Sequence, residues 1–372
     1  MKRLTIMMFA VCLAATALTA QAQEPQQTET ADDRTEALET KVSALEKIVD
    51  KLPKLSGFVQ LLYNYENSSP VTSHFRVRRA RLIASGNIFR NYADYNLTVE
   101  FAGTVKPIDA FVRLTPWKQF NVQIGAFRPA FSLENLNYGA TTMELIDYPQ
   151  IVMKMTTLSD ISGIANGSTG RDLGIQAYGG LFNKRGFSTV QYYVGVFNGA
   201  GLEFNTGNSD KNLAAMLRIN PVKDLALVGS VYIGTWAPSG AGSYAKRNRW
   251  SGGFMFDNKA WFLRGEYLGG VTGGMTGNNL LVKPENGRLV TDGAFIMGGA
   301  WFCNRRIAPV VRAEYYSQNA DARSQTTDIF YTAGILYCPW RYLRLQVNYT
   351  AKTYTYADRC GHQAMVMLTG MF

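Results

Sequence analysis

The chain has 372 residues, a formal net charge of +10 and a mean hydropathy of −0.10. After the first 22 residues no apolar run reaches the about 18 residues that a membrane-spanning helix needs, which excludes a helical membrane protein. The abundance of Tyr, Phe and Gly (20, 20 and 35 residues) favours a fold built from strands and turns.

The first 22 residues have the pattern of a secretory signal peptide. Lys2 and Arg3 precede an apolar run over residues 4–18, and Ala20-Gln21-Ala22 matches a small-x-small cleavage site. A lipid-modified Cys12 would leave the apolar run too short. We therefore expect a mature, exported chain that begins at Gln23 with a net charge of +8, and export argues against nucleic acid as a partner.

Residues 23–54 are predicted to form a polar leader and a short helix. Apolar residues recur at heptad spacing up to Pro53, which ends the pattern: Leu38, Val42, Leu45, Val49 and Leu52. The seam indicates a coiled coil with other copies of the chain. One amphipathic helix packed on its own strands is the alternative.

From Leu55 onward the hydrophobic period becomes 2, with one face polar and the other apolar, as in membrane-spanning strands. Sixteen segments show this pattern: 55–66, 74–89, 93–103, 108–115, 119–129, 171–182, 187–198, 211–220, 224–236, 246–257, 260–271, 292–303, 307–318, 326–338, 341–354 and 361–372.

Short and long connections alternate along these segments, as they do between the two ends of an outer-membrane barrel. The short ones are Pro116-Trp117-Lys118, Asn183-Lys184-Arg185-Gly186, Pro221-Val222-Lys223, Asn258-Lys259, Asn304-Arg305-Arg306 and Pro339-Trp340. We predict an all-β fold, a 16-stranded antiparallel transmembrane β-barrel over residues 55–372. Its short turns and its N-terminus would face the periplasm of a Gram-negative bacterium.

The connection over residues 130–170 is unusually long, and we expect it to fold into the barrel and constrict it. It holds one basic residue and four acidic ones, so it carries −3: Lys154, Glu134, Glu144, Asp147 and Asp160.

Strand parity places a set of arginines on the interior face: Arg113, Arg218, Arg249, Arg264, Arg312 and Arg344. Arg76, Arg78, Arg79 and Arg81 cannot share one face of a regular strand. A β-bulge near Arg78-Arg79 would leave Arg76 and Arg81 inside. Arg128 and Arg171 flank the long loop.

Two interpretations of these arginines remain open. They form a basic path that lowers the barrier for anions, or they pair with interior acids. The acids on the same face are Asp109 near Arg113, Glu266 near Arg264 and Glu314 near Arg312. In the first case the acidic loop would face a basic wall and set up a transverse field.

The sequence resembles the phosphate-selective porin O/P family in its Bacteroidetes-type form. The resemblance is carried by Ser56-Gly57-Phe58-Val59-Gln60, by Phe75-Arg76-Val77-Arg78-Arg79-Ala80-Arg81-Leu82, by Gly125-Ala126-Phe127-Arg128-Pro129-Ala130-Phe131-Ser132-Leu133-Glu134, and by the terminal Phe372. It implies a homotrimer of sixteen-stranded barrels, each with its own pore, surrounded by outer-membrane lipid and lipopolysaccharide. Phe372 would be the signal for the barrel-assembly machinery.

Namesake members of that family pass phosphate along lumen arginines and a lysine cluster. This chain has only Lys154 in its long loop. We therefore expect passive diffusion of small hydrophilic solutes with a mild anion preference, and phosphate as one candidate.

The alternatives are an outer-membrane barrel enzyme and a surface protein that binds polysaccharide. An enzyme would need a general base, and His74 and His362 are the only histidines. We expect no catalytic residue, cofactor or metal site. Cys303 and Cys338 are expected to be too far apart for a disulfide, with a third strand between theirs.

Overall fold

The computed structural model describes residues 40–43, 52–68, 70, 72–89, 92–163, 168–184, 186–202, 210–238, 244–276 and 280–372. The chain divides into two units, residues 1–52 and 53–372. In the first unit residues 40–43 are helical. The predicted signal peptide, the polar leader and most of the heptad seam lie outside the described residues.

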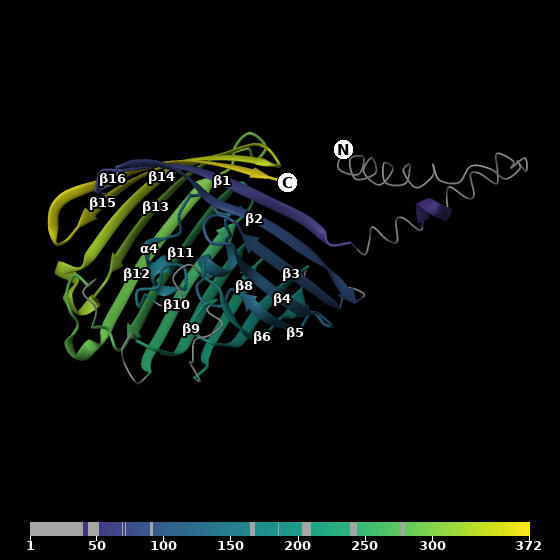
Figure 1. Cartoon of the computed structure of the whole chain (residues 1–372), viewed down its shortest axis with the longest axis horizontal. Coiled ribbons are helices and arrows are strands. Elements are labelled where there is room, and N and C mark those ends of the chain that lie inside the picture. The colour runs from purple at the N-terminus through teal and green to yellow at the C-terminus, as the bar shows by residue number, and fades with distance from the viewer. Residues whose placement is uncertain are drawn as a thin grey trace, which may run out of the picture. The chain divides into compact units, whose positions relative to one another are not determined.

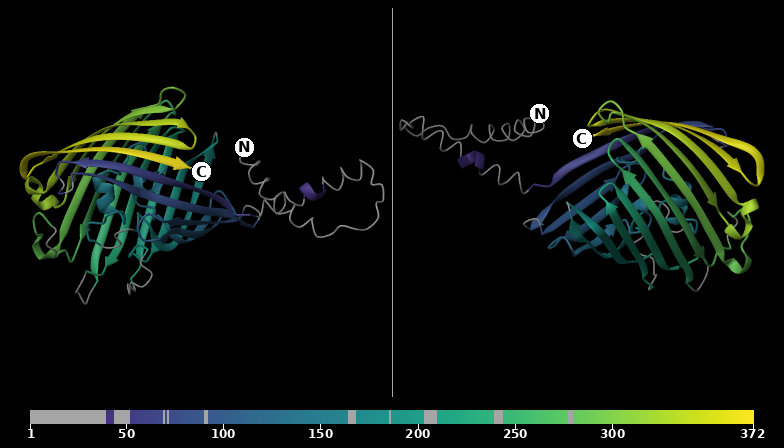
Figure 2. Two further views of the ribbon diagram at one scale, coloured as in Figure 1. Left: turned by 45° about the horizontal axis from the view of Figure 1, so that its top comes forward. Right: turned by 180° about the vertical axis from the view of Figure 1, so that it is seen from behind.

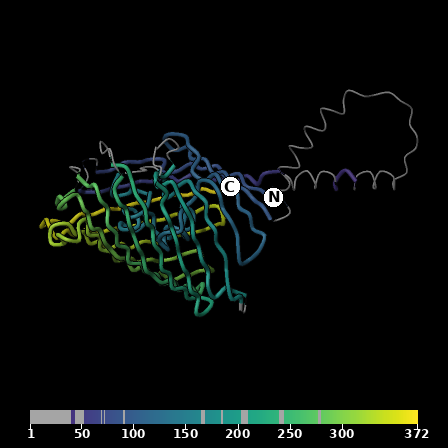
Figure 3. The backbone as a smooth tube through the Cα atoms, turned by 90° about the horizontal axis from the view of Figure 1, so that it is seen from below, coloured from purple at the N-terminus to yellow at the C-terminus, as the bar shows by residue number. Residues whose placement is uncertain are grey.

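The second unit is a closed barrel of sixteen antiparallel strands in which each strand pairs with its neighbours in the chain and β16 pairs with β1. Figures 1 and 2 show the tilted strands closing on themselves, and the tube in Figure 3 follows the same path. The strands are β1 (Lys54–Glu66), β2 (Ser73–Phe89), β3 (Ala93–Glu100), β4 (Lys106–Leu114), β5 (Asn121–Phe127), β6 (Asp172–Lys184), β7 (Phe187–Phe197), β8 (Asn212–Val222), β9 (Leu225–Trp236), β10 (Ala245–Asp257), β11 (Trp261–Thr272), β12 (Leu289–Ala300), β13 (Ile307–Ser317), β14 (Thr327–Trp340), β15 (Leu343–Tyr354) and β16 (Ala357–Met371).

Alternation within each strand separates an apolar outer face from a mixed interior. In β1, for example, Gln60 and Leu62 are buried, while Val59 and Leu61 are exposed. Successive side chains of each strand point to opposite faces of the barrel wall, so the exposed apolar side chains together form an outer surface suited to lipid. The predicted sixteen-stranded barrel is confirmed. No helix among the described residues is long and apolar enough to cross a membrane.

Two of the predicted turns lie closer to the C-terminus than expected, because the strands before them are longer. Pro221 and Val222 belong to β8, and Pro339 and Trp340 belong to β14. Both prolines lie where the pairing register shifts, so their missing N–H groups break no regular ladder. The turns themselves begin at Lys223 and Arg341.

The expected bulge in β2 is confirmed. Gln60 pairs with Arg79 and Leu61 pairs with Val77, so Arg78 is the extra residue. This shift in register restores the alternation of inward and outward side chains, which the sequence interrupts around Arg78. Arg76, Arg79 and Arg81 lie opposite the interior residues Leu62, Gln60 and Phe58.

The connection between β5 and β6, residues 128–171, is called the inward loop here. It carries two short helices, α3 (Leu133–Asn137) and α4 (Gln150–Met155), and Figure 1 shows α4 within the ring of strands. Its apolar side chains, including Leu145, Ile151 and Met155, are buried against interior residues of the wall such as Phe295 and Leu336. The loop is therefore packed into the barrel as part of its core.

The strand that leads into this loop depends on Gly125. Its φ is +130°, and a Cβ there would lie 2.1 Å from the carbonyl oxygen of Ala110 in the adjacent β4. The close approach of β5 to β4 therefore requires glycine, both for its conformation and for the space.

We predict that Gly125→Ala destabilises the barrel by about 2–4 kcal/mol, because it adds backbone strain and a clash with another strand. Gly252→Ala is the matched control, since a Cβ at Gly252 meets nothing within 4 Å. The effect is measured as the temperature at which the folded barrel converts to the slower or faster migrating unfolded form on a gel. Equal midpoints for the two variants would show that β5 tolerates the side chain.

Candidate functional site

The interior of the barrel at the level of the inward loop is the candidate site. It brings the wall arginines and the acidic residues of the loop into direct contact at three places. Each of these places is an anchor of the loop.

The first anchor is formed by Arg264 and Glu266 on β11. Arg264 Nε donates to Glu134 at 2.7 Å, and its Nη2 donates to Glu144 at 2.6 Å. Glu266 accepts from the hydroxyl of Ser132 and from the backbone N–H of Leu133, both at 2.8 Å. The expected Arg264–Glu266 pair is therefore wrong, because each residue binds a different part of the loop.

The second anchor is Asp160 between two arginines of β10. Arg249 binds both carboxylate oxygens, at 2.7 and 2.8 Å, and Arg247 approaches at 3.4 Å. Burial alone would raise the pKa of Asp160. The charges of Arg249 and Arg247, with hydrogen bonds from Arg249 and Ser162, outweigh burial and lower this pKa from 3.8 to about 2.

The third anchor joins Asp147 to the bulged strand and to β13. Arg78 forms an ion pair with the Asp147 carboxylate, and Arg312 donates to the Asp147 backbone carbonyl at 2.7 Å. Arg312 also pairs with Glu314 at 2.9 Å, as the sequence suggested, and Glu314 accepts from the N–H of Gln150 at the start of α4.

Backbone carbonyls of the loop engage two more arginines. Arg344 on β15 donates to Met143 O at 2.7 Å, and Arg128 donates to the carbonyls of Asn135 and Tyr138 at 2.7 and 2.6 Å. Arg171, at the end of the loop, pairs with Asp109 at 2.9 Å. Asp109 thus does not pair with Arg113, which binds Asp94 at 2.8 Å.

Burial distinguishes these contacts from surface ion pairs. The side chains of Asp160, Glu134 and Arg264 are at most 2% exposed. Buried pairs of this kind contribute little net stability, but removing one partner leaves an uncompensated buried charge that costs about 3–5 kcal/mol. The pairs therefore fix where the loop lies. The expected transverse field between an acidic loop and a basic wall is wrong for these carboxylates, because each of them contacts an arginine of the wall directly.

Strand pairing shows on which face of the wall the predicted residues lie. On the interior face are Arg76, Arg81, Arg113, Arg218, Arg249, Arg264, Arg312, Arg344, Asp109, Glu266 and Glu314. Arg128 follows β5 directly. Lys154 lies on α4, half-buried, and no carboxylate of the described residues forms an ion pair with it.

Sequence reasoning missed several interior charges: Arg78, Arg79, Arg247, Asp94 and Glu100. Arg247 has the parity of Arg249, so parity alone could have identified it. Arg78 and Arg79 follow from the exact position of the bulge. Glu100 binds Arg81 at 2.7 Å across the β2–β3 pair.

Some interior arginines have no carboxylate within ion-pair distance among the described residues. They are Arg76, Arg79, Arg128, Arg218 and Arg344. Arg79 instead donates to Gln60 and Arg218 to Asn220, both at 2.9 Å. Arg79, Gln60, Thr369 and Arg344 form one row across four adjacent strands.

The described residues contain no group of three or more His, Cys, Asp or Glu that could hold a metal ion. Cys303, Cys338 and Cys360 are free thiols. The chemistry of the interior is therefore that of arginines, carboxylates and amides facing one another.

A closed sixteen-stranded barrel with an apolar outer face, a charged interior and a long loop folded inside is the architecture of a porin of the Gram-negative outer membrane. The profile of the family described as phosphate-selective porin O and P matches residues 54–270, and the chain belongs to this family.

Solved porins share the fold at low sequence identity. The anion-selective porin from Comamonas acidovorans is 13% identical with a TM-score of 0.61, over 86% of this chain and 99% of that one. The outer membrane channel DcaP of Acinetobacter baumannii is 14% identical with a TM-score of 0.60, over 86% and 97%. OmpT of Vibrio cholerae in its trimer form is 11% identical with a TM-score of 0.55, over 86% and 99%. Comparison with curated protein sequences gives no match.

We predict that Glu134→Gln combined with Asp147→Asn loosens the inward loop and raises single-channel conductance, because it removes one of the two loop carboxylates of the first anchor and the carboxylate of the third. Asp321→Asn is the control, since its pair with Arg288 is more than half exposed at the rim. Conductance is measured in planar bilayers at fixed salt. Unchanged conductance in the double variant would show that apolar packing alone holds the loop.

The lowered pKa of Asp160 in the second anchor leads us to predict that the conductance depends on pH. Because the pKa of Asp160 is lowered from 3.8 to about 2, its contribution to loop attachment is complete above about pH 4 and is lost as pH falls to about 2. We expect the conductance to change over this interval in the native chain. Asp160→Asn, which resembles the protonated state at every pH, should remove this part of the change. Identical pH curves would assign the transition to other carboxylates.

Proposed function

We propose that this porin passes small hydrophilic solutes by passive diffusion with a mild preference for anions. The observation that carries the proposal is the imbalance between interior charges without a partner. Arg76 is exposed, and Arg79 and Arg218 are half-buried. Of the interior acids that have no ion-pair partner among the described residues, Glu266 and Asp172 are at most 3% exposed and accept several hydrogen bonds, whereas Asp257 and Asp328 are half-buried. The unpaired charge that reaches water is therefore positive on balance, because these arginines outnumber the two half-buried acids.

A basic cavity at the short-turn end supports the same preference. It has a volume of about 490 Å³, and Lys118, Arg218 and Lys223 line it together with amide and hydroxyl groups. A positive wall lowers the barrier for anions and raises it for cations in a narrow water-filled path. The solved Comamonas porin is anion-selective, which agrees with the proposal at the level of the fold.

A dedicated phosphate trap is the weaker form of the proposal. Phosphate binding favours several free arginines or lysines that converge on one anion. Most arginines near the inward loop already bind carboxylates or carbonyls, and Lys154 is the only basic residue of residues 130–170. General diffusion fits this arrangement better, with phosphate as one of the solutes.

We also propose a homotrimer with the N-terminus in the periplasm and a cleaved signal peptide. The start of β1 and the end of β16 lie at the end with the short turns, where Gly57 and Phe372 exchange backbone hydrogen bonds at 3.1 and 3.0 Å. The trimer is supported by the family resemblance and by the trimer form of the Vibrio cholerae porin. Lipopolysaccharide contacts and recognition of Phe372 by the assembly machinery belong to the same proposal.

The two histidines argue for a channel over a barrel enzyme. His74 lies opposite Asn64 on the interior face, whereas His362 pairs with Ala351 on the outer face and its ring nitrogen is 2.7 Å from the hydroxyl of Tyr349. They point to opposite sides of the wall and cannot serve one catalytic site.

Selectivity tests the proposal directly. Under a KCl gradient in a planar bilayer, we expect a reversal potential that indicates chloride preference. Arg76→Ser with Arg79→Ser and Arg218→Ser should move the permeability ratio toward unity, because three water-facing charges are lost. The matched control removes three charges from the short turns, with Lys259→Asn, Arg305→Asn and Arg306→Ser. Asparagine tolerates the positive φ of Lys259 and Arg305.

Cation preference of the native chain, or a triple variant with unchanged selectivity, would contradict the proposal. Block of the chloride current by micromolar phosphate would contradict general diffusion and establish a phosphate site.

A further inference from the structure

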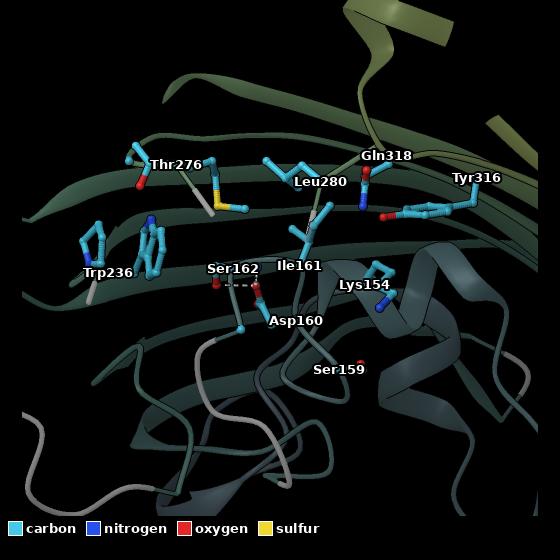
Figure 4. A pocket seen from close by; sticks show the side chains of 14 residues that line it. Lys154, Ser159, Asp160, Ile161, Ser162, Trp236, Thr276, Leu280, Tyr316 and Gln318 are labelled. Carbon is cyan, nitrogen blue, oxygen red and sulfur yellow. Dashed lines mark hydrogen bonds between the residues drawn. The ribbon is translucent and has the colours of Figure 1, made fainter. Parts of the chain in front are cut away.

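A second cavity lies at the end of the barrel with the long loops and is called the mouth pocket here. Its volume is about 410 Å³, within the about 300–1,000 Å³ of small-molecule sites. The inward loop forms one side, and described residues at and just beyond the ends of β9, β11 and β13 form the others. Figure 4 shows its side chains.

One end of the mouth pocket holds two hydrogen-bond donors for which the described part of the chain supplies no acceptor. The Tyr316 hydroxyl has no hydrogen-bond partner although the residue is only 4% exposed, and the Lys154 ammonium has no ion-pair partner among the described residues. Figure 4 shows both at the same end, near Gln318. A buried hydroxyl left unpaired costs free energy. These two donors together suit a ligand that brings an acceptor, above all an anion.

The other end is apolar. Trp236 and Met275 belong to one apolar cluster and line it, and Figure 4 shows Ile161 and Leu280 between Trp236 and Tyr316. The indole N–H of Trp236 already donates to Gly273 O at 2.9 Å, so the ring offers carbon to the cavity. A sugar would bury hydroxyl groups here without partners, whereas a hydrocarbon group would lose nothing.

Neighbouring charges limit the ligand to a single negative charge. Asp160 lines the cavity, but Arg247 and Arg249 neutralise it and Ser162 donates to it at 2.6 Å. Asp328 lies opposite Tyr316 in β14 and offsets part of the attraction of Lys154. Phosphate, with nearly two charges at neutral pH, gains less from this balance than a carboxylate does.

We propose that the mouth pocket binds a small organic monocarboxylate, with the carboxylate between Lys154 and Tyr316 and the apolar part against Trp236 and Met275. The role of this site in transport rests on the proposed function. A site at the outer mouth would concentrate organic acid anions before they enter the path past the inward loop, and would favour them over mineral anions.

Calorimetric titration of the purified full-length barrel in detergent tests the proposal with phenylacetate as the probe. Acetate has the charge without the apolar part, and 2-phenylethanol has the apolar part without the charge. We expect phenylacetate to bind more tightly than either. No binding of phenylacetate, or equal binding of acetate, would overturn the proposal.

Variants locate the site. Lys154→Met should weaken phenylacetate binding roughly tenfold, and Tyr316→Phe about threefold, because each removes one hydrogen bond to the carboxylate. Lys283→Met is the matched control on the same end of the barrel, outside the pocket. Heat-modifiable migration verifies folding, and Lys154→Gln replaces Lys154→Met if the latter fails to fold. Native affinity in the folded Lys154 and Tyr316 variants would overturn the assignment.

The outcomes separate this inference from the proposed function. Anion-preferring conductance without phenylacetate binding overturns the mouth pocket alone. Phenylacetate binding that depends on Lys154, in a channel that prefers cations, supports the pocket and overturns the proposed selectivity.

Discussion

A carboxylate inside this barrel is stable only where a cation or several N–H groups meet it, and that requirement determines where the inward loop lies. Glu134, Glu144, Asp147 and Asp160 enter an interior lined by Phe295, Leu336 and other apolar groups. Each of these carboxylates ends on an arginine of the wall. Charge therefore gives the loop its register, and apolar contacts fill the space between the anchors.

This arrangement consumes much of the positive charge that the sequence assigns to the interior. Arg249 and Arg264 hold the loop, while Arg76, Arg79 and Arg218 remain for solutes. Two uses of arginine thus coexist in one wall. The two interpretations of the interior arginines, a basic path and structural ion pairs, apply to different members of the set.

The strands were predictable from the sequence because parity and turn residues are local. Arg113, Arg218 and Arg312 follow from alternation alone, and the β2 bulge follows from the broken alternation around Arg78. The partners were not predictable in the same way. Arg264 and Glu266 are two residues apart on one face, yet Arg264 binds Glu134 and Glu266 binds Ser132, more than 120 residues earlier in the chain. Such pairs depend on how an irregular loop folds, and no period in the sequence records that.

The pairing of β1 with β16 has a consequence for how the protein forms. Phe58 lies opposite Met371, so one edge of the first strand stays without a partner until the last strand has been made. Every other strand pair can form between neighbours in the chain, whereas ring closure joins segments of the greatest sequence separation, the slowest kind of contact to form. Until then both edges are open templates for pairing with other chains. The barrel must therefore be kept from aggregation throughout synthesis and transport, and it becomes safe in a single late step.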